Sequence, residues 1–287
     1  QFVENLMSRA SKLAKTIALA EGTDVRAAKA AEILTQKNVC KVVLIGNEDE
    51  IKAKFPEIDF TGVSFDDPKT SEHRAEYANT LYELRKAKGM TEEQALNIVT
   101  NNNMFYACVA LKRGDVDGVV GGAVFSSADV SRAAFQVIKA APGISSVSSC
   151  FVMVPPEDFK YKKYPAYIFS DCAVIPYPTS DQLSDIVVAA ADSAKKICEM
   201  DPKIAMLSFS TKGSANHESV EKVRVAYQKV REEHPEIVVD GELQLDASLV
   251  DSVANQKAPG SPVAGQANVL VFPNLDAGNI GYKIAQR

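Results

Sequence analysis

Two serines, an aspartate and an arginine stand close together in the segment "GGAVFSSADVSR" (121–132), at Ser126, Ser127, Asp129 and Arg132. The apolar residues before this segment are typical of a buried strand, and the residues after it are typical of a helix. A helix N-terminus attracts phosphate because its N–H groups are free and the helix dipole is positive there. An arginine adds a planar fork of donors that matches phosphate oxygens. The segment therefore predicts an anion-binding loop.

Two later segments place similar residues between a strand-like run and a helix: "SFSTKGSANH" (208–217) and "FPNLDAGNIGYK" (272–283). The residues predicted to contact a ligand there are Ser210, Thr211, Gly213, Asn279, Tyr282 and Lys283. Helix capping is the simpler interpretation of any one of these loops, because serine, aspartate and glycine are ordinary turn residues. Three such segments, each with a lysine or an arginine, favour an anion-binding site. None contains a Walker A or G-x-G-x-x-G pattern, so a classical nucleotide-binding loop is not predicted.

A cysteine stands at the end of another strand-like run, in "FSDCAVIPYP", where Cys172 follows Asp171. A nucleophilic cysteine needs a base or a cation nearby to lower the pKa of its thiol. No histidine is close to Cys172 in the sequence. A single cysteine at a strand end is more often a packed residue, so we take packing as the main interpretation and nucleophilic catalysis as the minor one.

The elements that must position these residues repeat one unit, an apolar strand followed by a turn and a helix. This unit occurs at 16–34, 40–55, 116–140, 203–230, 236–256 and 268–287. Strands that are apolar on both faces and alternate with helices predict mainly parallel sheets covered on both sides, which is an α/β fold. Ligands of such folds bind at the carboxyl ends of the strands, where the three polar loops lie.

Local signals predict where several elements begin and where the chain divides. A helix is expected after Thr23 or Asp24, and Thr91 with Gln94 forms a capping box. The segment 155–172 predicts a hairpin or a strand with a charged loop. The stretch "KAAPGISSVSSC" (139–150), with its proline, glycine and serines, is the best domain boundary, which predicts domains at 1–143 and 144–287.

Composition disfavours several classes of protein: nucleic-acid-binding, membrane-spanning, disulfide-bonded and metal-binding. The 287 residues are 46% hydrophobic and carry a net charge of -5, which disfavours a nucleic-acid partner. Charges and glycines interrupt every apolar run before the roughly 20 residues of a membrane span, and the N-terminal segment reads as an amphipathic helix rather than a signal peptide. Five scattered cysteines and three histidines argue against disulfides and metal sites. We expect a cytoplasmic protein without a metal cofactor.

Several blocks, in this order along the chain, together resemble phosphate acetyltransferase (phosphotransacetylase), within the phosphate acetyl/butyryltransferase family. They include "LYELRKAKGMT", "GGAVFSSADVSRAAFQVIKAAPGISSVSS", "DCAVIPYPT", "IAMLSFSTKGS", "DGELQLDA" and "KAPGSPVAGQANVLVFPNLDAGNIGYK". The resemblance implies transfer of an acetyl group between coenzyme A and inorganic phosphate through acetyl phosphate, without a metal. It also implies a homodimer of two three-layer α/β domains with an interdomain cleft, as in the isocitrate and isopropylmalate dehydrogenases.

The resemblance also implies roles for residues of this chain. Arg85, in "ELRKAKG", and Arg132, in "ADVSR", would be the catalytic arginines that hold the substrate. Ser126 and Ser127 would line the same pocket. The side opposite would be formed by Ser210, Thr211 and Gly213. Cys172 matches a family cysteine near the site, although family members transfer the acetyl group directly within a ternary complex.

One departure concerns the chain end. The family continues past "GNIGYKIAQR" through a segment of the form Asp-Leu-Ser-Arg-Gly, which carries a serine, an arginine and a nearby aspartate assigned to catalysis. The resemblance therefore implies that the general base and part of the first domain lie beyond Arg287, and we expect little transferase activity from these 287 residues. The alternatives are a phosphate butyryltransferase, and a non-catalytic domain that binds acetyl-CoA or acetyl phosphate.

Overall fold

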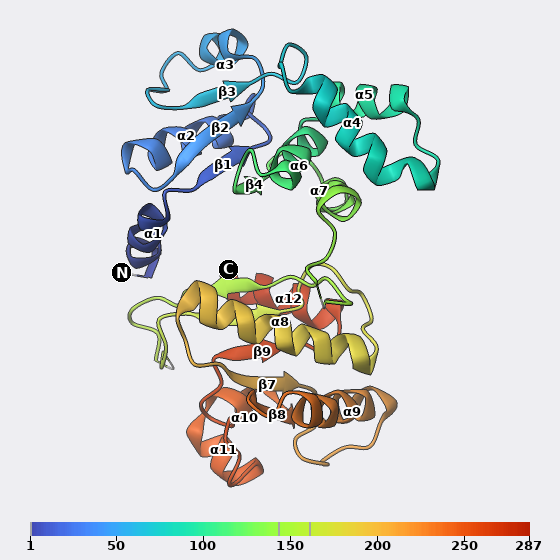
Figure 1. Cartoon of the computed structure of the whole chain (residues 1–287). Coiled ribbons are helices and arrows are strands. Elements are labelled where there is room, and N and C mark those ends of the chain that lie inside the picture. Colours follow the sequence, from blue (N-terminus) through green and yellow to red (C-terminus); the bar gives the residue numbers. More distant parts are fainter. Residues whose placement is uncertain (1, 143, 161) are drawn as a thin grey trace. The chain divides into compact units, whose positions relative to one another are not determined.

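The computed structural model describes residues 2–142, 144–160 and 162–287 (Figure 1). Packing divides the chain into two compact units, Val3–Lys139 and Ala140–Arg287. The division falls close to the boundary predicted from the sequence, whose Gly143 lies outside the described residues. Each unit has its own sheet and its own hydrophobic core.

The first unit is built on a four-stranded parallel sheet in the order β3-β2-β1-β4. Its strands are β1 (Thr16–Leu19), β2 (Lys41–Ile45), β3 (Ser64–Asp66) and β4 (Gly118–Val120). Its helices are α1 (Phe2–Leu13), α2 (Val25–Gln36), α3 (Glu48–Lys54), α4 (Arg74–Arg85), α5 (Glu92–Asn101), α6 (Asn103–Arg113) and α7 (Ser127–Ala133), with the short turns η1 (Lys86–Lys88) and η2 (Ala134–Ile138).

Both faces of this first sheet are buried. Helices α2 and α3 cover one face, where Leu44 packs with Ala28 and Ile51. Helices α4, α5 and α6 pack on the other side, around Ile45 and Tyr106. Burial on both faces explains why β1 and β2 read as continuous apolar runs in the sequence.

The second unit contains a five-stranded sheet in the order β5-β6-β9-β7-β8. Its strands are β5 (Phe151–Met153), β6 (Tyr167–Ser170), β7 (Lys203–Leu207), β8 (Val238–Leu243) and β9 (Val269–Val271). Its helices are α8 (Ser180–Cys198), α9 (Glu218–Glu233), α10 (Leu245–Leu249), α11 (Asp251–Lys257) and α12 (Leu275–Gln286). Among the described strands of this sheet, only β5 runs antiparallel, and it pairs with β6. The segment 155–172 itself holds a charged loop followed by the strand β6, which is the second of the two predicted alternatives.

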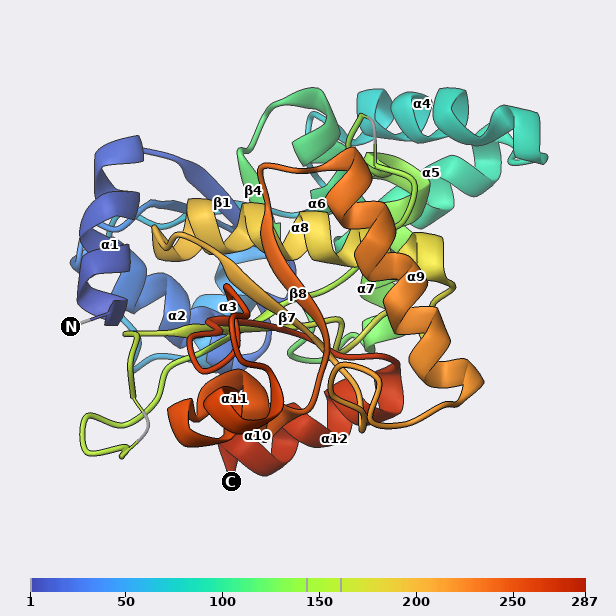
Figure 2. The same ribbon diagram turned by 90° about the horizontal axis from the view of Figure 1, so that it is seen from below.

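The second sheet is also covered on both faces. Helices α8 and α9 lie against each other on one face, where they enclose Ile204 and Met206 (Figure 2). On the other face Leu207 and Leu270 pack with residues of α12 and of the loop before β9. Each unit therefore has three layers, and the predicted α/β class with mainly parallel sheets is confirmed.

Helix starts follow the local signals in the sequence. The carboxylate of Asp24, not Thr23, caps α2 by accepting from the Arg26 backbone N–H. Thr91 and Gln94 form the predicted capping box at the start of α5. Each cap satisfies N–H groups that have no partner within the helix. No described helix combines the length and the apolar character needed to cross a membrane.

Candidate active site

The loop between β4 and α7 is held by a buried carboxylate from the end of β1. Glu21 is 7% exposed, and its Oε2 accepts from the backbone N–H groups of Gly122 (3.0 Å) and Ala123 (2.9 Å). Its Oε1 accepts from the N–H groups of Val124 (2.6 Å) and Phe125 (2.7 Å). Burial raises the pKa of Glu21, but these four hydrogen bonds outweigh it and leave the pKa below its ordinary value.

Hydrogen bonds join Ser126, Asp129 and Arg132 to one another at the start of α7. Ser126 caps the helix: its Oγ accepts from the Asp129 N–H and donates to the Asp129 carboxylate at 2.7 Å. Arg132 donates from Nη1 to the same carboxylate at 2.8 Å. Both bonds lower the pKa of Asp129, and the bond from the Ser126 hydroxyl contributes more than the bond from Arg132.

Much of this group is open to a ligand. The Arg132 side chain is 56% exposed, and its other guanidinium donors take no partner from the described part of the chain. Ser127, the first residue of α7, is also exposed. An exposed ion pair contributes only about 0–1 kcal/mol, so a phosphate can compete with Asp129 for Arg132. The structure thus brings Ser126, Asp129 and Arg132 together as the sequence predicts.

Arg85, the other predicted catalytic arginine, ends α4. Its Nε is buried and has no hydrogen-bond partner among the described residues. A buried donor without a partner costs about 1–3 kcal/mol. No described contact connects Arg85 with Arg132. That both arginines contact the same phosphate stays a prediction.

In the second unit, the loop after β7 is also held by a buried carboxylate. Glu242, at the end of β8, is 2% exposed, and it accepts from Ser210 Oγ at 2.8 Å and from the Gly213 N–H at 2.8 Å. Arg224 on α9 donates to it from Nε at 3.0 Å and from Nη2 at 3.1 Å. Burial raises the pKa of Glu242, but the bonds from Arg224, Gly213 and Ser210 outweigh it and lower the pKa to about 2.

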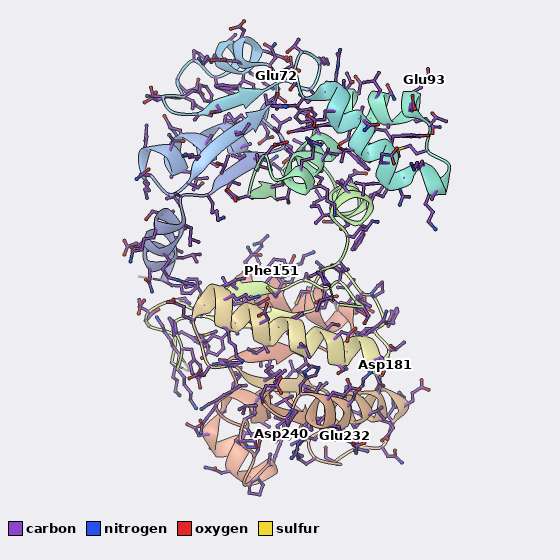
Figure 3. All side chains as sticks on the ribbon, in the orientation of Figure 1. Glu72, Glu93, Phe151, Asp181, Glu232 and Asp240 are labelled. Atoms are coloured by element: carbon purple, nitrogen blue, oxygen red, sulfur yellow. The ribbon has the colours of Figure 1, made fainter. Side chains whose placement is uncertain are left out.

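This arrangement corrects the predicted role of the loop. The backbone N–H groups of 210–214, expected to orient phosphate, all donate within the protein. Ser210 is fully buried, and Thr211 exchanges hydrogen bonds with Gln244. Lys212 pairs with the buried Asp240 of β8. Figure 3 labels Asp240. Ser210, Thr211 and Gly213 therefore build the loop, because their donors already have partners. The Ser210 hydroxyl and the Gly213 N–H donate to the buried Glu242, and the other donors go to neighbouring hydroxyl and amide oxygens.

Cys172 is packed, as the main interpretation of its sequence context predicts. Its side chain is fully buried, and burial, with a smaller contribution from the Asp171 charge, raises the pKa of its thiol to about 12. Its carbonyl accepts from Asn279 Nδ2 at 3.1 Å, and Gly278 packs directly against Asp171 and Cys172. Cys172 therefore presents no exposed sulfur to a substrate in the described structure, and its predicted substrate contact has no support there.

If the protein catalyses the acetyl transfer that the sequence resemblance implies, substitution of Cys172 by serine is expected to leave most of that activity intact. It should lower stability modestly, because a hydroxyl replaces a packed sulfur. Mass spectrometry of the wild-type protein after incubation with acetyl phosphate should find no acetyl group on Cys172. A stoichiometric adduct there would contradict this assignment. Cys108, equally buried in the first unit and with a pKa raised to about 11, offers the matched control as Cys108→Ser.

The last predicted residues lie on α12. Asn279 is used in the contact to Cys172 described above. The Tyr282 ring stacks on Phe151 of β5 with centroids 4.0 Å apart (Figure 3). Lys283 is exposed, and its ammonium lies 5.9 Å from the Tyr282 ring centroid. Of these three, only Lys283 is fully available, and its contact with substrate stays a prediction.

The carboxyl ends of the parallel strands in the second unit bring three loops together. Tyr177, after β6, donates to Asp276 of α12 at 2.9 Å. The side chain of Lys222 on α9 donates to the Pro273 carbonyl at 2.7 Å. Burial lowers the pKa of Lys222.

Sequence reasoning missed Lys222, as it missed Glu21, Arg224 and Glu242. Only Glu21 had a visible signal, a carboxylate directly after an apolar strand.

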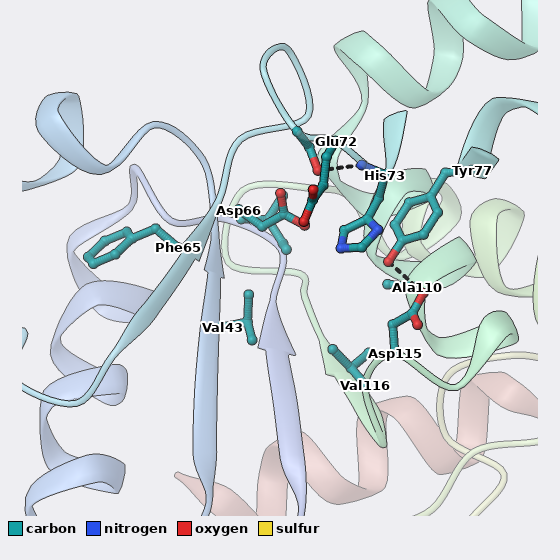
Figure 4. A pocket seen from close by; sticks show the side chains of 11 residues that line it. Val43, Phe65, Asp66, Glu72, His73, Tyr77, Ala110, Asp115 and Val116 are labelled. Carbon is teal, nitrogen blue, oxygen red and sulfur yellow. Dashed lines mark hydrogen bonds between the residues drawn. The ribbon is translucent and has the colours of Figure 1, made fainter. Parts of the chain in front are cut away.

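A separate cavity of about 400 Å³ lies in the first unit, against β2 and β3 (Figure 4). Tyr77 donates to Asp115 there at 2.8 Å and stacks on His73. No predicted site residue lines the cavity, and its charged walls are carboxylates, which repel phosphate. It is therefore not the anion site. The lining residues are Val43, Ile45, Phe65, Asp66, Ser71, Glu72, His73, Tyr77, Ala110, Asp115 and Val116.

Comparison with known proteins places this architecture in a class of transferases. The family model described as phosphate acetyl/butaryl transferase matches residues 1–287. A phosphate acetyltransferase of Acetivibrio thermocellus is 48% identical over 286 residues, which are 100% of this chain and 86% of that protein. The chain belongs to the phosphate acetyl/butaryl transferase family.

Solved structures agree with this placement. The EutD phosphotransacetylase from Staphylococcus aureus matches with a TM-score of 0.88 and 40% identity, over 100% of this chain and 86% of that one. A phosphotransacetylase from Streptococcus pyogenes matches with a TM-score of 0.91 and 37% identity, over 100% and 85%. The predicted likeness to isocitrate and isopropylmalate dehydrogenases stays a prediction.

Proposed function

We infer that this protein transfers an acetyl group between coenzyme A and inorganic phosphate, converting acetyl-CoA and phosphate into coenzyme A and acetyl phosphate, or the reverse. The observation that carries this inference is the match along the whole chain to proteins named phosphate acetyltransferase, at up to 48% identity. The exposed guanidinium of Arg132 beside Ser126 and Ser127 supplies the phosphate-binding chemistry that the reaction needs.

The reaction itself needs little covalent participation by the protein. The thiol of coenzyme A, with an ordinary pKa of about 8.5, gives its proton to a base and becomes the nucleophile. The sulfur attacks the acetyl carbonyl carbon, and the bond from that carbon to the phosphate oxygen breaks, so phosphate leaves with the electron pair. Arg132 neutralises the phosphate, and we propose that Arg85 does the same. The buried Cys172 forms no acyl intermediate.

Further properties of the reaction are part of the same proposal. We propose that no metal cofactor takes part, because an acyl phosphate is already activated and the arginines supply the positive charge that phosphate needs. We also propose that the protein is a homodimer that acts in the cytoplasm on these small substrates, with no nucleic-acid or membrane partner. The homodimer is what the sequence resemblance implies, and the acidic net charge disfavours nucleic acid.

The test is a thioester assay on the natural gene product, with acetyl, propionyl and butyryl phosphates offered at equal concentration. Acetyl phosphate should give the highest kcat/KM, with coenzyme A as the acceptor. A preference for butyryl phosphate would identify a phosphate butyryltransferase. Tight binding of coenzyme A and acetyl phosphate without turnover would identify a non-catalytic binding domain and overturn the proposed function.

A further inference from the structure

The attachment of the 122–125 loop to the rest of the first unit is concentrated on one side chain. Four consecutive backbone N–H groups converge on the carboxylate of Glu21, with none shared by another acceptor among the described residues. Successive N–H groups that converge in this way form a concave anion-binding nest. Here the anion is part of the protein, and no ligand oxygen can use these donors while Glu21 is in place.

Phe125, at the end of the loop, is half-buried and packs against the core of the first unit, but Gly122 and Val124 are not buried. Gly122 is exposed and has a φ of +113°, and the Val124 side chain is 70% exposed. The other polar anchor is Arg26, whose Nη2 donates to the Ala123 carbonyl at 2.5 Å and whose side chain is itself 65% exposed. A segment with few buried apolar contacts has low local stability unless polar contacts fix it. Hydrogen bonds to a charged acceptor are about twice as strong as neutral ones.

The loop leads without interruption into the phosphate-binding group. Phe125 is the last residue bound by Glu21, and Ser126 is the cap of α7. The packing of Val130 and Ala133 in the core of the first unit fixes the body of α7. The start of α7, where Ser126 and Asp129 hold Arg132, also depends on where the loop is fixed. A displacement of about 1 Å in such a group can reduce a rate by about 10²-fold.

We propose that Glu21 is a positioning residue for the phosphate site: its carboxylate fills the nest of the 122–125 loop and thereby sets the place of Arg132. This proposal rests on the proposed function for its kinetic consequence. The competing view is that Glu21 only stabilises the fold of the first unit.

Two variants of Glu21 separate these views. Glu21→Gln keeps the size of the side chain, but its NH₂ group faces two N–H donors and repels them. Glu21→Ala removes the acceptor and leaves a space lined by four free donors. Both should lower kcat/KM for acetyl phosphate by about 10²-fold, mostly through KM, with the KM for coenzyme A nearly unchanged. Glu32→Gln is the matched control, because Glu32 is also 7% exposed and accepts a backbone N–H, that of Asp59, away from the loop.

Chemical rescue by formate separates the two views, because kcat/KM would not recover if Glu21 only stabilised the fold. Formate carries the missing carboxylate and is small enough for the space left in Glu21→Ala. Added formate should restore at least about tenfold of the lost kcat/KM, whereas chloride at equal ionic strength should not. Formate should have no such effect on wild type or on Glu32→Gln.

Hydrogen exchange tests the proposal without any activity. The amides of 122–125 should exchange slowly in wild type, fast in Glu21→Ala, and slowly again with formate, while the amides of β1 and β2 stay protected throughout. Unchanged exchange in the variant, or equal losses for both substrates without formate rescue, would overturn the proposal. An inactive wild type, together with formate-dependent protection of 122–125 in Glu21→Ala, would refute the proposed function and leave the positioning of the loop standing.

Discussion

Replacement of Arg132 by alanine in the natural gene product should lower kcat/KM for acetyl phosphate, and for phosphate in the reverse direction, by about 10²–10³-fold, with the KM for coenzyme A nearly unchanged. The reason is that Arg132 is the exposed cation of the 121–132 segment and gives only Nη1 to Asp129. The developing negative charge on the departing phosphate would lose its fixed partner. Steady-state kinetics with each of the three substrates varied in turn measures the effect.

Two further variants make this result specific. Arg132→Lys keeps the charge but loses the planar fork, so it should fall between wild type and alanine. Arg113→Ala is the control, because Arg113 lies in the same unit and pairs with Glu76 and Asp115. Arg113→Ala should leave all three substrates nearly unaffected. Wild-type kinetics for Arg132→Ala would remove Arg132 from the site.

The parts of this structure that could be predicted from the sequence are those encoded by neighbouring residues. The strand–helix units follow from runs of apolar residues and from capping residues within three positions of the helix they start, such as Thr91 with Gln94. The grouping of Ser126, Asp129 and Arg132 on one helical turn is local in the same sense. These contacts need no knowledge of the order of the strands in the sheet.

The parts that could not be predicted join residues far apart in the chain. Glu21 meets Gly122, 101 positions later, only because β1 and β4 are neighbours in the first sheet. Glu242 meets Ser210 because β8 lies beside β7. The sequence shows polar loops after both β4 and β7, but not that their N–H groups already have partners within the protein: Glu21 for 122–125, and Glu242 or nearby hydroxyl and carbonyl oxygens for 210–214. The N–H groups of 210–214, expected to orient phosphate, are for that reason not free in the described structure.

Glu242→Gln should lower the free energy of unfolding at pH 7 by about 3 kcal/mol, because it leaves Arg224 beside a buried neutral amide. The dependence of the free energy of unfolding on pH should change as well. The pKa of Glu242 is depressed from 4.5 to about 2 in the folded protein. A depressed folded-state pKa contributes stability that is complete above the unfolded value and is lost as the pH falls towards the folded value. Wild type should therefore lose about 3 kcal/mol from this group between about pH 4.5 and pH 2.

In Glu242→Gln that loss is already present at neutral pH, so the two unfolding curves should converge as the pH falls. Urea titrations from pH 7 downwards measure this convergence. Glu232→Gln is the control, because Glu232 is an exposed carboxylate on α9 in the same unit (Figure 3). A constant difference in stability between wild type and Glu242→Gln at every pH would mean that the packing of the side chain, not its charge, holds the 208–217 loop. The convergence distinguishes the two because only the charge titrates.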